Sequence, residues 1–176
     1  MSILDPNFDI DDDVIYRGNF LEFIVRETKC HQVILLLDPD NVVNMYQLKN
    51  RFPDNKVLFD MSQCNPGGYE EFVKQYVLPF VNGSIDYLLL DNIDKIPDIE
   101  ERDEFEQLLK FMAKGEEYDP FQNIHNVGRI GTLDFGNLNN HLVMRCAQKP
   151  EFLQEFTYIM VDCRNYIQLV NEMIED

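Results

Sequence analysis

The chain alternates between short apolar runs and longer stretches in which apolar residues recur at helical spacing. The longest purely aliphatic run is Ile34-Leu35-Leu36-Leu37, which is too short for a typical helix. Continuous apolar runs of this length are typical of strands that are buried on both faces of a parallel sheet. We expect strands at residues 32–37, 56–60, 85–90, 141–146 and 158–162.

Amphipathic stretches separate these runs and predict the helices. The clearest helix covers residues 69–80, in which apolar residues recur every three or four positions. Further helices are expected at residues 18–29, 42–52, 98–114, 149–156 and 166–174. Strands that alternate with helices predict right-handed crossovers and helices on both faces of the sheet. The expected fold is therefore an α/β three-layer sandwich around a mostly parallel five-stranded sheet.

The length of 176 residues favours a single α/β domain that spans residues 1–176. Five of the first 13 residues are Asp, so we expect residues 1–17 to form a solvated acidic arm. Residues 120–140 contain turn formers and little periodicity, which predicts a long loop. A small hairpin is expected within this loop, around residues 128–136.

Acidic residues dominate the charge, with 32 Asp and Glu against 15 Lys and Arg and a net charge of −17. Nucleic acids and anionic membranes attract proteins through Lys and Arg, so we expect neither as a direct partner. No apolar run is long enough to span a bilayer, and no leader-like segment opens the chain. The four cysteines lack the spacing of zinc ligands, which favours reduced thiols and a cytoplasmic location.

Polar residues follow the predicted strands, where parallel sheets bind their ligands. The first strand is followed by DPDN at residues 38–41, the third by DNID at 91–94, and the fourth by AQKP at 147–150. Because the carboxyl ends of parallel strands share one edge of the sheet, these segments are the candidates for chemistry.

The order of strands, helices and polar segments along the chain resembles that of a known protein family. LLLDNIDKIPDIEERDEFEQLLKFM at residues 88–112 combines a strand that ends in acidic residues with a helix that begins with them. LVMRCAQKPEFLQEF at 142–156 adds a strand with a polar turn, and YIMVDC at 158–163 adds another strand. From about residue 20 to residue 163, the chain resembles the α/β domain of the AAA+ class of P-loop ATPases. The resemblance implies that the five strands lie in the order 5-1-4-3-2.

The chain departs from that family where the nucleotide binds. The family's G-x-x-x-x-G-K-[ST] loop (Walker A) cradles phosphates with backbone N–H groups and holds Mg²⁺ through its Ser or Thr. In this chain the corresponding loop is residues 38–45, and both glycines and the Lys are missing. An Asp at the first glycine position repels a polyphosphate. The degenerate loop positions are Asp38, Asn41, Asn44 and Met45.

The rest of the family's catalytic apparatus is also altered. By the resemblance, Asp91 stands where the family binds Mg²⁺, and Asn92 stands where it keeps a catalytic Glu that activates water. Asn cannot act as a general base near neutral pH. Gln148 stands near the position of the family's sensor Asn. We therefore expect no catalytic residue and no cofactor, and we interpret the chain as a catalytically inactive, degenerate ATPase-like domain.

Such a pseudoenzyme would act as an acidic protein–protein interaction module. The expected partner is another protein, either an ATPase or a second copy of this chain. The acidic helix at 98–114 and the loop at 120–140 are the surfaces expected to carry the binding. An acidic surface speeds the encounter with a basic partner, so the binding should weaken as salt is added.

The segment DPDNVV at 38–43 supports an alternative interpretation as an enzyme, because it resembles the D-x-D-x-[TV]-[LV] motif of the haloacid dehalogenase superfamily. This resemblance implies a Mg²⁺-dependent phosphatase with Asp38 as the nucleophile and Asp40 as the acid/base. Its Mg²⁺ would be held by Asp38, Asp91 and Asp94. The stretch before the next strand has room for a helix but not for the flap that this superfamily inserts. Carboxylates at these positions also suit simple helix capping.

A third interpretation rests on charge alone. A small chain with a net charge of −17 can mimic DNA and occupy the basic groove of a nucleic-acid-binding protein. Such a mimic needs carboxylates at phosphate-like spacing on one face, and competition with DNA for one purified protein distinguishes it from the other interpretations.

Overall fold

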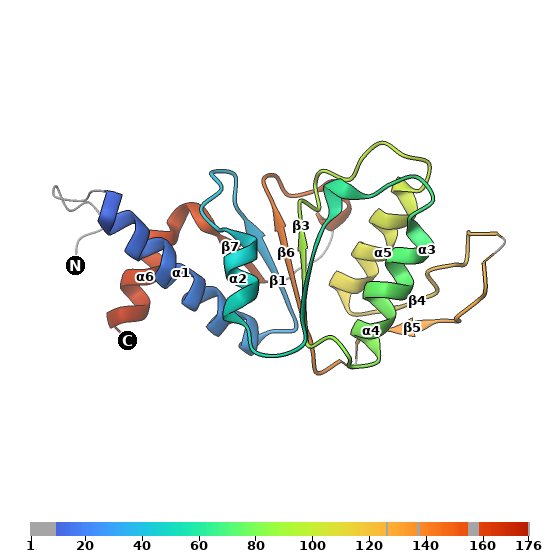
Figure 1. Cartoon of the computed structure of the whole chain (residues 1–176), viewed down its shortest axis with the longest axis horizontal. Helices are drawn as coiled ribbons and strands as arrows, with labels where there is room; N and C mark the ends of the chain where they lie inside the picture. Colours follow the sequence, from blue (N-terminus) through green and yellow to red (C-terminus); the bar gives the residue numbers. More distant parts are fainter. Residues whose placement is uncertain (1–9, 126, 137, 155–158, 176) are drawn as a thin grey trace.

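The computed structural model describes residues 10–125, 127–136, 138–154 and 159–175, and its centre is a five-stranded sheet between two layers of helices (Figure 1). The strands lie in the order β2-β3-β6-β1-β7, and every neighbouring pair is parallel. Their bounds are β1 Val33–Leu37, β2 Lys56–Asp60, β3 Tyr87–Asp91, β6 His141–Cys146 and β7 Ile159–Asp162. Numbered along the chain, this is the order 5-1-4-3-2, so the expected three-layer α/β architecture and strand order are confirmed.

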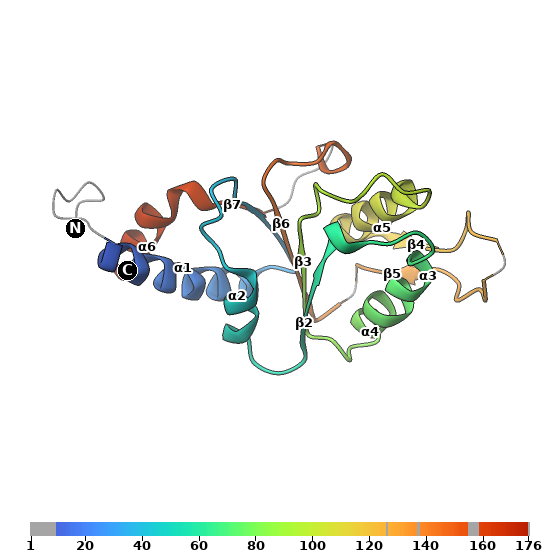
Figure 2. The same ribbon diagram turned by 45° about the horizontal axis from the view of Figure 1, so that its top comes forward.

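Helices cover both faces of the sheet (Figures 1 and 2). One face carries α1 (Ile10–Cys30), α2 (Met45–Arg51) and α6 (Tyr166–Glu175). The other carries a continuous helical segment and α5 (Arg102–Lys114). The segment consists of α3 (Tyr69–Phe72), the π-helical turn η2 (Val73–Val77) and α4 (Leu78–Val81). Three 3-10 turns complete the helical elements of the described residues: η1 (Met61–Gln63), η3 (Glu151–Leu153) and η4 (Cys163–Asn165).

The connections that leave β1 and β6 run over opposite faces of the sheet. The chain after β1 forms α2, whose Leu48 packs into the core on the α1 side. The chain after β6 forms η3, whose Leu153 packs into the core on the α5 side. Since β1 and β6 are neighbours, the crevice between their carboxyl ends is the place where open α/β sheets bind ligands.

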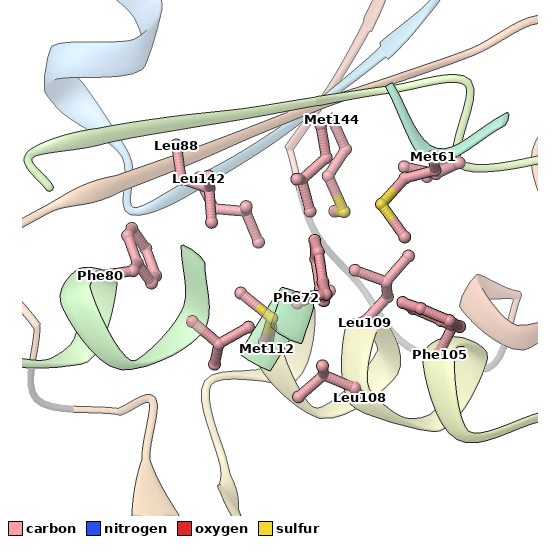
Figure 3. Close-up of a cluster of buried hydrophobic side chains, with 14 of the residues drawn as sticks. Met61, Phe72, Phe80, Leu88, Phe105, Leu108, Leu109, Met112, Leu142 and Met144 are labelled. Atoms are coloured by element: carbon pink, nitrogen blue, oxygen red, sulfur yellow. The ribbon is translucent and has the colours of Figure 1, made fainter. Parts of the chain in front are cut away.

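Successive side chains of the strands point to opposite faces of the sheet and pack into two separate hydrophobic cores. Leu88, Leu142 and Met144 point toward the α5 side, where they face Phe72 and Leu109 (Figure 3). All five side chains are almost fully buried. Burial of large apolar side chains contributes roughly 1.5–3 kcal/mol each, so this core fixes α3 and α5 against the sheet.

The second core lies on the α1 side. Ile34 and Leu36 of β1 point into it and meet Phe20 and Ile24 of α1, and all four are fully buried. α1 and α6 lie against each other and complete this layer (Figure 2).

The expected acidic arm is corrected in part, because residues 10–17 belong to α1. Three Asp in the first turn favour the helix N-terminus through its dipole. Asp13 also pairs with Arg17 at 2.8 Å and accepts a hydrogen bond from the hydroxyl of Tyr166. The hydroxyl of Tyr16 donates to Asn171 Oδ1 at 2.8 Å. Residues 1–9 of the expected arm lie outside the described residues.

An antiparallel pair of strands is present, but only its second strand lies within residues 128–136, where the hairpin was expected. β4 (Glu117–Tyr118) pairs antiparallel with β5 (Leu133–Asp134), so the first strand precedes the expected loop. Phe121 and Phe135 are buried and anchor this segment on the α5 side. Residues 126 and 137 lie outside the described residues.

Several helices are shorter than expected. The predicted helix at 42–52 begins only at Met45, because the Asn44 side chain caps it by accepting from Gln47 N–H at 3.0 Å. The predicted helix at 98–114 begins at Arg102 and ends where expected, at a left-handed Gly115. The predicted helix at 149–156 is the short turn η3, and residues 155–156 lie outside the described residues. Among the described residues, no helix is both long and apolar enough to cross a membrane.

Candidate functional site

The carboxyl ends of β1, β3 and β6 bring three charged side chains together. Asp38 follows β1, and its backbone N–H donates to the carbonyl of Cys146 at the end of β6 at 2.8 Å. Asp91 ends β3, and Arg145 is the second-last residue of β6. Since β6 lies between β1 and β3, its Arg145 faces a carboxylate on each side.

The Arg145 guanidinium bridges the two carboxylates. Its Nε and Nη2 donate to the two oxygens of Asp91 at 2.7 and 2.8 Å. Its Nη1 donates to Asp38 Oδ2 at 3.2 Å and to Asn41 Oδ1 at 3.0 Å, and also to the carbonyl of Val43. Charge-assisted bidentate bonds of this kind are the strongest that a guanidinium makes.

The Asp38 carboxylate uses the backbone donors of its own loop. Its Oδ1 accepts from Val42 N–H at 2.8 Å, and its Oδ2 accepts from Val43 N–H at 2.9 Å. The side chain has no exposed surface. In a phosphate-binding loop, such N–H groups bind the anion. Here the anion that they bind is a carboxylate of the same chain.

The surroundings keep Arg145 charged. Burial opposes the charge, but the hydrogen bonds and charge of Asp91, followed by those of Asp38, outweigh burial and raise the pKa of the guanidinium. The side chain of Arg145 is only 14% exposed and that of Asp91 13%. The guanidinium and the two carboxyl groups therefore form a largely buried cluster in which one cation bridges two acidic side chains.

A second polar network adjoins the cluster at the end of β2. Asp60 Oδ1 accepts from the backbone N–H and the hydroxyl of Ser62, at 3.0 and 2.7 Å, and from Asn92 Nδ2 at 2.9 Å. Burial would raise the pKa of Asp60, but the hydrogen bonds from Asn92 and then Ser62 outweigh burial and lower it. Asn92 thus serves as a hydrogen-bond donor within this network.

The other three residues singled out in this loop, Asn41, Asn44 and Met45, stabilise the local structure. Asn41 adopts a left-handed conformation with φ of 54°, which Asn tolerates, and its carbonyl accepts from Arg17 Nη1 at 3.3 Å. Asn44 caps α2, and Met45 is buried as its first residue. The side chains of Asn44 and Met45 therefore stabilise the start of α2.

The residues of the alternative phosphatase site have different surroundings and different hydrogen-bond partners. Asp40 is exposed, whereas Asp38 is buried two residues earlier. Asp94 Oδ2 accepts from the backbone N–H groups of Ala147 and Gln148, at 3.2 and 3.1 Å, and so fixes the turn after β6. Within the described part of the chain, no group of three or more His, Cys, Asp or Glu residues is placed to hold a metal ion.

A pocket of about 570 Å³ opens beside the cluster, between α1, α2 and the ends of β2 and β3. Arg17, Tyr46, Asp60, Asp91 and Arg145 contribute to its lining. Arg17 ties α1 to the loop after β1 through the carbonyls of Asn41 and Val42, each at 3.3 Å.

Sequence reasoning found the acidic members of the site and missed Arg145, which it counted only as part of a strand. The signal for this residue is a single Arg near the carboxyl end of an otherwise apolar strand. A buried charge needs a partner, and the expected strand order places β6 between two strands that end at Asp. Arg17 was missed because its segment was expected to be a solvated arm.

Comparison of the chain with protein-family models, with curated proteins and with solved structures found no match.

Proposed function

We propose that this chain is a non-catalytic, degenerate ATPase-like domain that binds another protein. The observation that carries the proposal is the Asp38–Arg145–Asp91 cluster at the ligand-binding edge of the sheet. Asp38 accepts the hydrogen bonds that the N–H groups of the loop after β1 can donate. The guanidinium of Arg145 lies between the carboxyl groups of Asp38 and Asp91.

The cluster disfavours a nucleotide on electrostatic and steric grounds. A triphosphate would have to displace Asp38 from Val42 N–H and Val43 N–H and then lie beside that carboxylate. Leaving a buried charge without its partner costs several kcal/mol, typically about 3–5. The retained strand order supports an ATPase-like scaffold, and the filled loop supports its loss of nucleotide chemistry.

The same geometry supports this proposal over the phosphatase alternative. A carboxylate nucleophile needs an oxygen within reach of its substrate. The Asp38 side chain has no exposed surface, and both of its oxygens accept hydrogen bonds from the loop. Arg145 lies between Asp38 and Asp91, so a Mg²⁺ ion shared by them would have to displace the guanidinium that bridges them.

The partner that we propose is a protein with a basic surface, because the chain carries a net charge of −17. The exposed face of α5 and the segment between β4 and β5 are two surfaces for it. Three of the four thiols are buried and none is bridged, which suits the cytoplasm that we propose as the compartment.

The experiment has a catalytic and a binding arm. Purified full-length chain is assayed with Mg²⁺ for hydrolysis of ATP and of a phosphomonoester, with Asp38→Asn as the control. We expect no turnover above that of Asp38→Asn, and turnover that this substitution removes contradicts the proposal. In the binding arm, a partner captured from the native cells is purified, and its Kd is measured at low and high salt. A salt-independent Kd contradicts the electrostatic part.

A further inference from the structure

β2 lies at one edge of the sheet, and no strand of the described residues pairs with its outer side. All five of its residues are only half-buried. The N–H of Tyr87 donates to the carbonyl of Asn55 at 3.2 Å, which fixes the alternation along the strand. By that alternation, the N–H and C=O of Leu58 face the open edge. Unpaired groups on an edge are a template for one further strand.

Two hollows flank this edge, one on each face of the sheet. Leu58 lines the pocket of about 570 Å³ on the α1 side. Phe59 lines a second pocket, of about 340 Å³, on the α5 side. Successive side chains of a strand point to opposite faces. A segment paired with β2 therefore places neighbouring side chains over different hollows.

The hollow beside Phe59 suits a cation. The Phe59 ring lies 5.1 Å from the ring of Phe72 and 4.9 Å from that of Tyr76, so three aromatic rings gather at its wall. Glu71 also lines it, and its Oε1 accepts from Gln75 Nε2 at 2.7 Å. A Lys or Arg head group is attracted to the faces of aromatic rings, and a neighbouring carboxylate adds to this attraction.

The open edge and the chemistry of the hollow together define the occupant. We propose that β2 binds an extended basic segment of another protein by strand addition, with a Lys or Arg side chain in the hollow beside Phe59. The adjoining residue of that segment is apolar and lies over Leu58. Main-chain hydrogen bonds supply affinity in this mode, and the two hollows supply specificity. A second copy of the chain is a poor occupant, because each copy carries a net charge of −17.

The test uses the full chain and a synthetic peptide of alternating Lys and Leu with blocked ends. Its matched control is the peptide of alternating Glu and Leu. We expect the Lys peptide to bind at least about tenfold more tightly. We also expect it to slow hydrogen exchange at the Leu58 amide. Binding without protection of that amide overturns the strand addition.

Two charge-reversal variants separate this site from general attraction to an acidic protein. Glu71→Lys alters the hollow, whereas Glu172→Lys makes the same change on α6. Both Glu are exposed, and each accepts from a Gln four residues away, Glu172 from Gln168 at 3.1 Å. We expect Glu71→Lys to weaken the Lys peptide by about tenfold and Glu172→Lys by about twofold at most. Equal weakening overturns the proposal.

The inference rests on the proposed protein-binding function, but the two fail differently. Turnover of ATP that requires Asp38 contradicts the proposed function, whatever the peptide does. Absence of peptide binding, with a purified natural partner still bound, contradicts only the site on β2. Protection of the Leu58 amide that rises with the concentration of the chain alone identifies a second copy as the occupant and overturns the basic partner.

Discussion

Asp91 and Arg145 meet across neighbouring strands in a bidentate ion pair, with Nε–Oδ1 and Nη2–Oδ2 distances of 2.7 and 2.8 Å. The same guanidinium reaches Asp38, which follows the strand on the other side of β6. One residue therefore joins the ends of three strands at the edge where open α/β sheets bind ligands.

Removal of the guanidinium should destabilise the fold strongly. Arg145→Met leaves two largely buried carboxylates without their cation, and we expect the free energy of unfolding to fall by about 3 kcal/mol. The measurement is urea denaturation at neutral pH. Arg164→Met is the matched control, because Arg164 makes the same bidentate contact with Asp162 at 2.9 and 2.8 Å but is exposed. We expect this control to leave stability nearly unchanged, and equal losses in the two variants would contradict the role of the cluster.

Asp91 and Arg145 should be energetically coupled. In a double-mutant cycle with Asp91→Asn and Arg145→Met, we expect the double variant to be more stable than the sum of the single losses predicts. The expected coupling energy is about 1–3 kcal/mol, because the groups are in direct contact and poorly hydrated. Additive losses, measured by the same denaturation, would show that the pair contributes little.

Acid should weaken the fold partly through Asp60. Hydrogen bonds from Asn92 and Ser62 hold the pKa of Asp60 below its ordinary value of about 4. A carboxyl group with a lowered pKa stabilises the fold above its unfolded-state pKa, and this stabilisation is lost as the pH falls through its folded-state pKa. We expect Asp60→Asn to reduce the fall in stability below about pH 4, whereas Asp54→Asn, at an exposed position, does not. Unfolding monitored from neutral pH into the acid range tests this, and identical curves for both variants would refute it.

The thiols should differ in reactivity. Cys30 is exposed, whereas Cys64, Cys146 and Cys163 are buried. Burial, followed by neighbouring carboxylates, raises the pKa of Cys64 and of Cys146 to about 12. Since the thiolate is the reactive form, we expect one thiol to react quickly with a disulfide reagent in the native protein and all four after unfolding. Fast reaction of a second thiol before unfolding would show that a core thiol is accessible.

Local pattern predicts the strands well. Residues 56–60 and 141–146 are strands with the expected bounds, because short apolar runs between turn formers leave little freedom. The start of α1 was missed, since three of its first four residues are Asp and its first turns gain stability from distant partners on α6. The π-helical turn was missed because helical periodicity does not distinguish one wider turn.

The sequence predicts only the acidic residues of the candidate site. Asp38 and Asp91 stand out as residues that follow or end strands, and their positions alone suggest metal or phosphate chemistry. The partner of both is Arg145, whose distance from them along the chain hides the contact. The expected strand order places β6 between β1 and β3, but the contact of its side chain with both carboxylates depends on long-range packing. The arrangement shows that groups of the chain itself occupy this edge of the sheet.

The most direct test of the central claim is thermal unfolding of the full chain with and without millimolar Mg²⁺ and ATP. A ligand that binds only the native state stabilises it by about 2.7 kcal/mol at a hundredfold excess over its Kd. Asp38 already accepts hydrogen bonds from the N–H groups of the loop and from Arg145. We therefore predict no shift in Tm with Mg²⁺, with ATP or with both. A rise in Tm that requires the nucleotide, or a rise with Mg²⁺ that Asp38→Asn abolishes, would contradict the account.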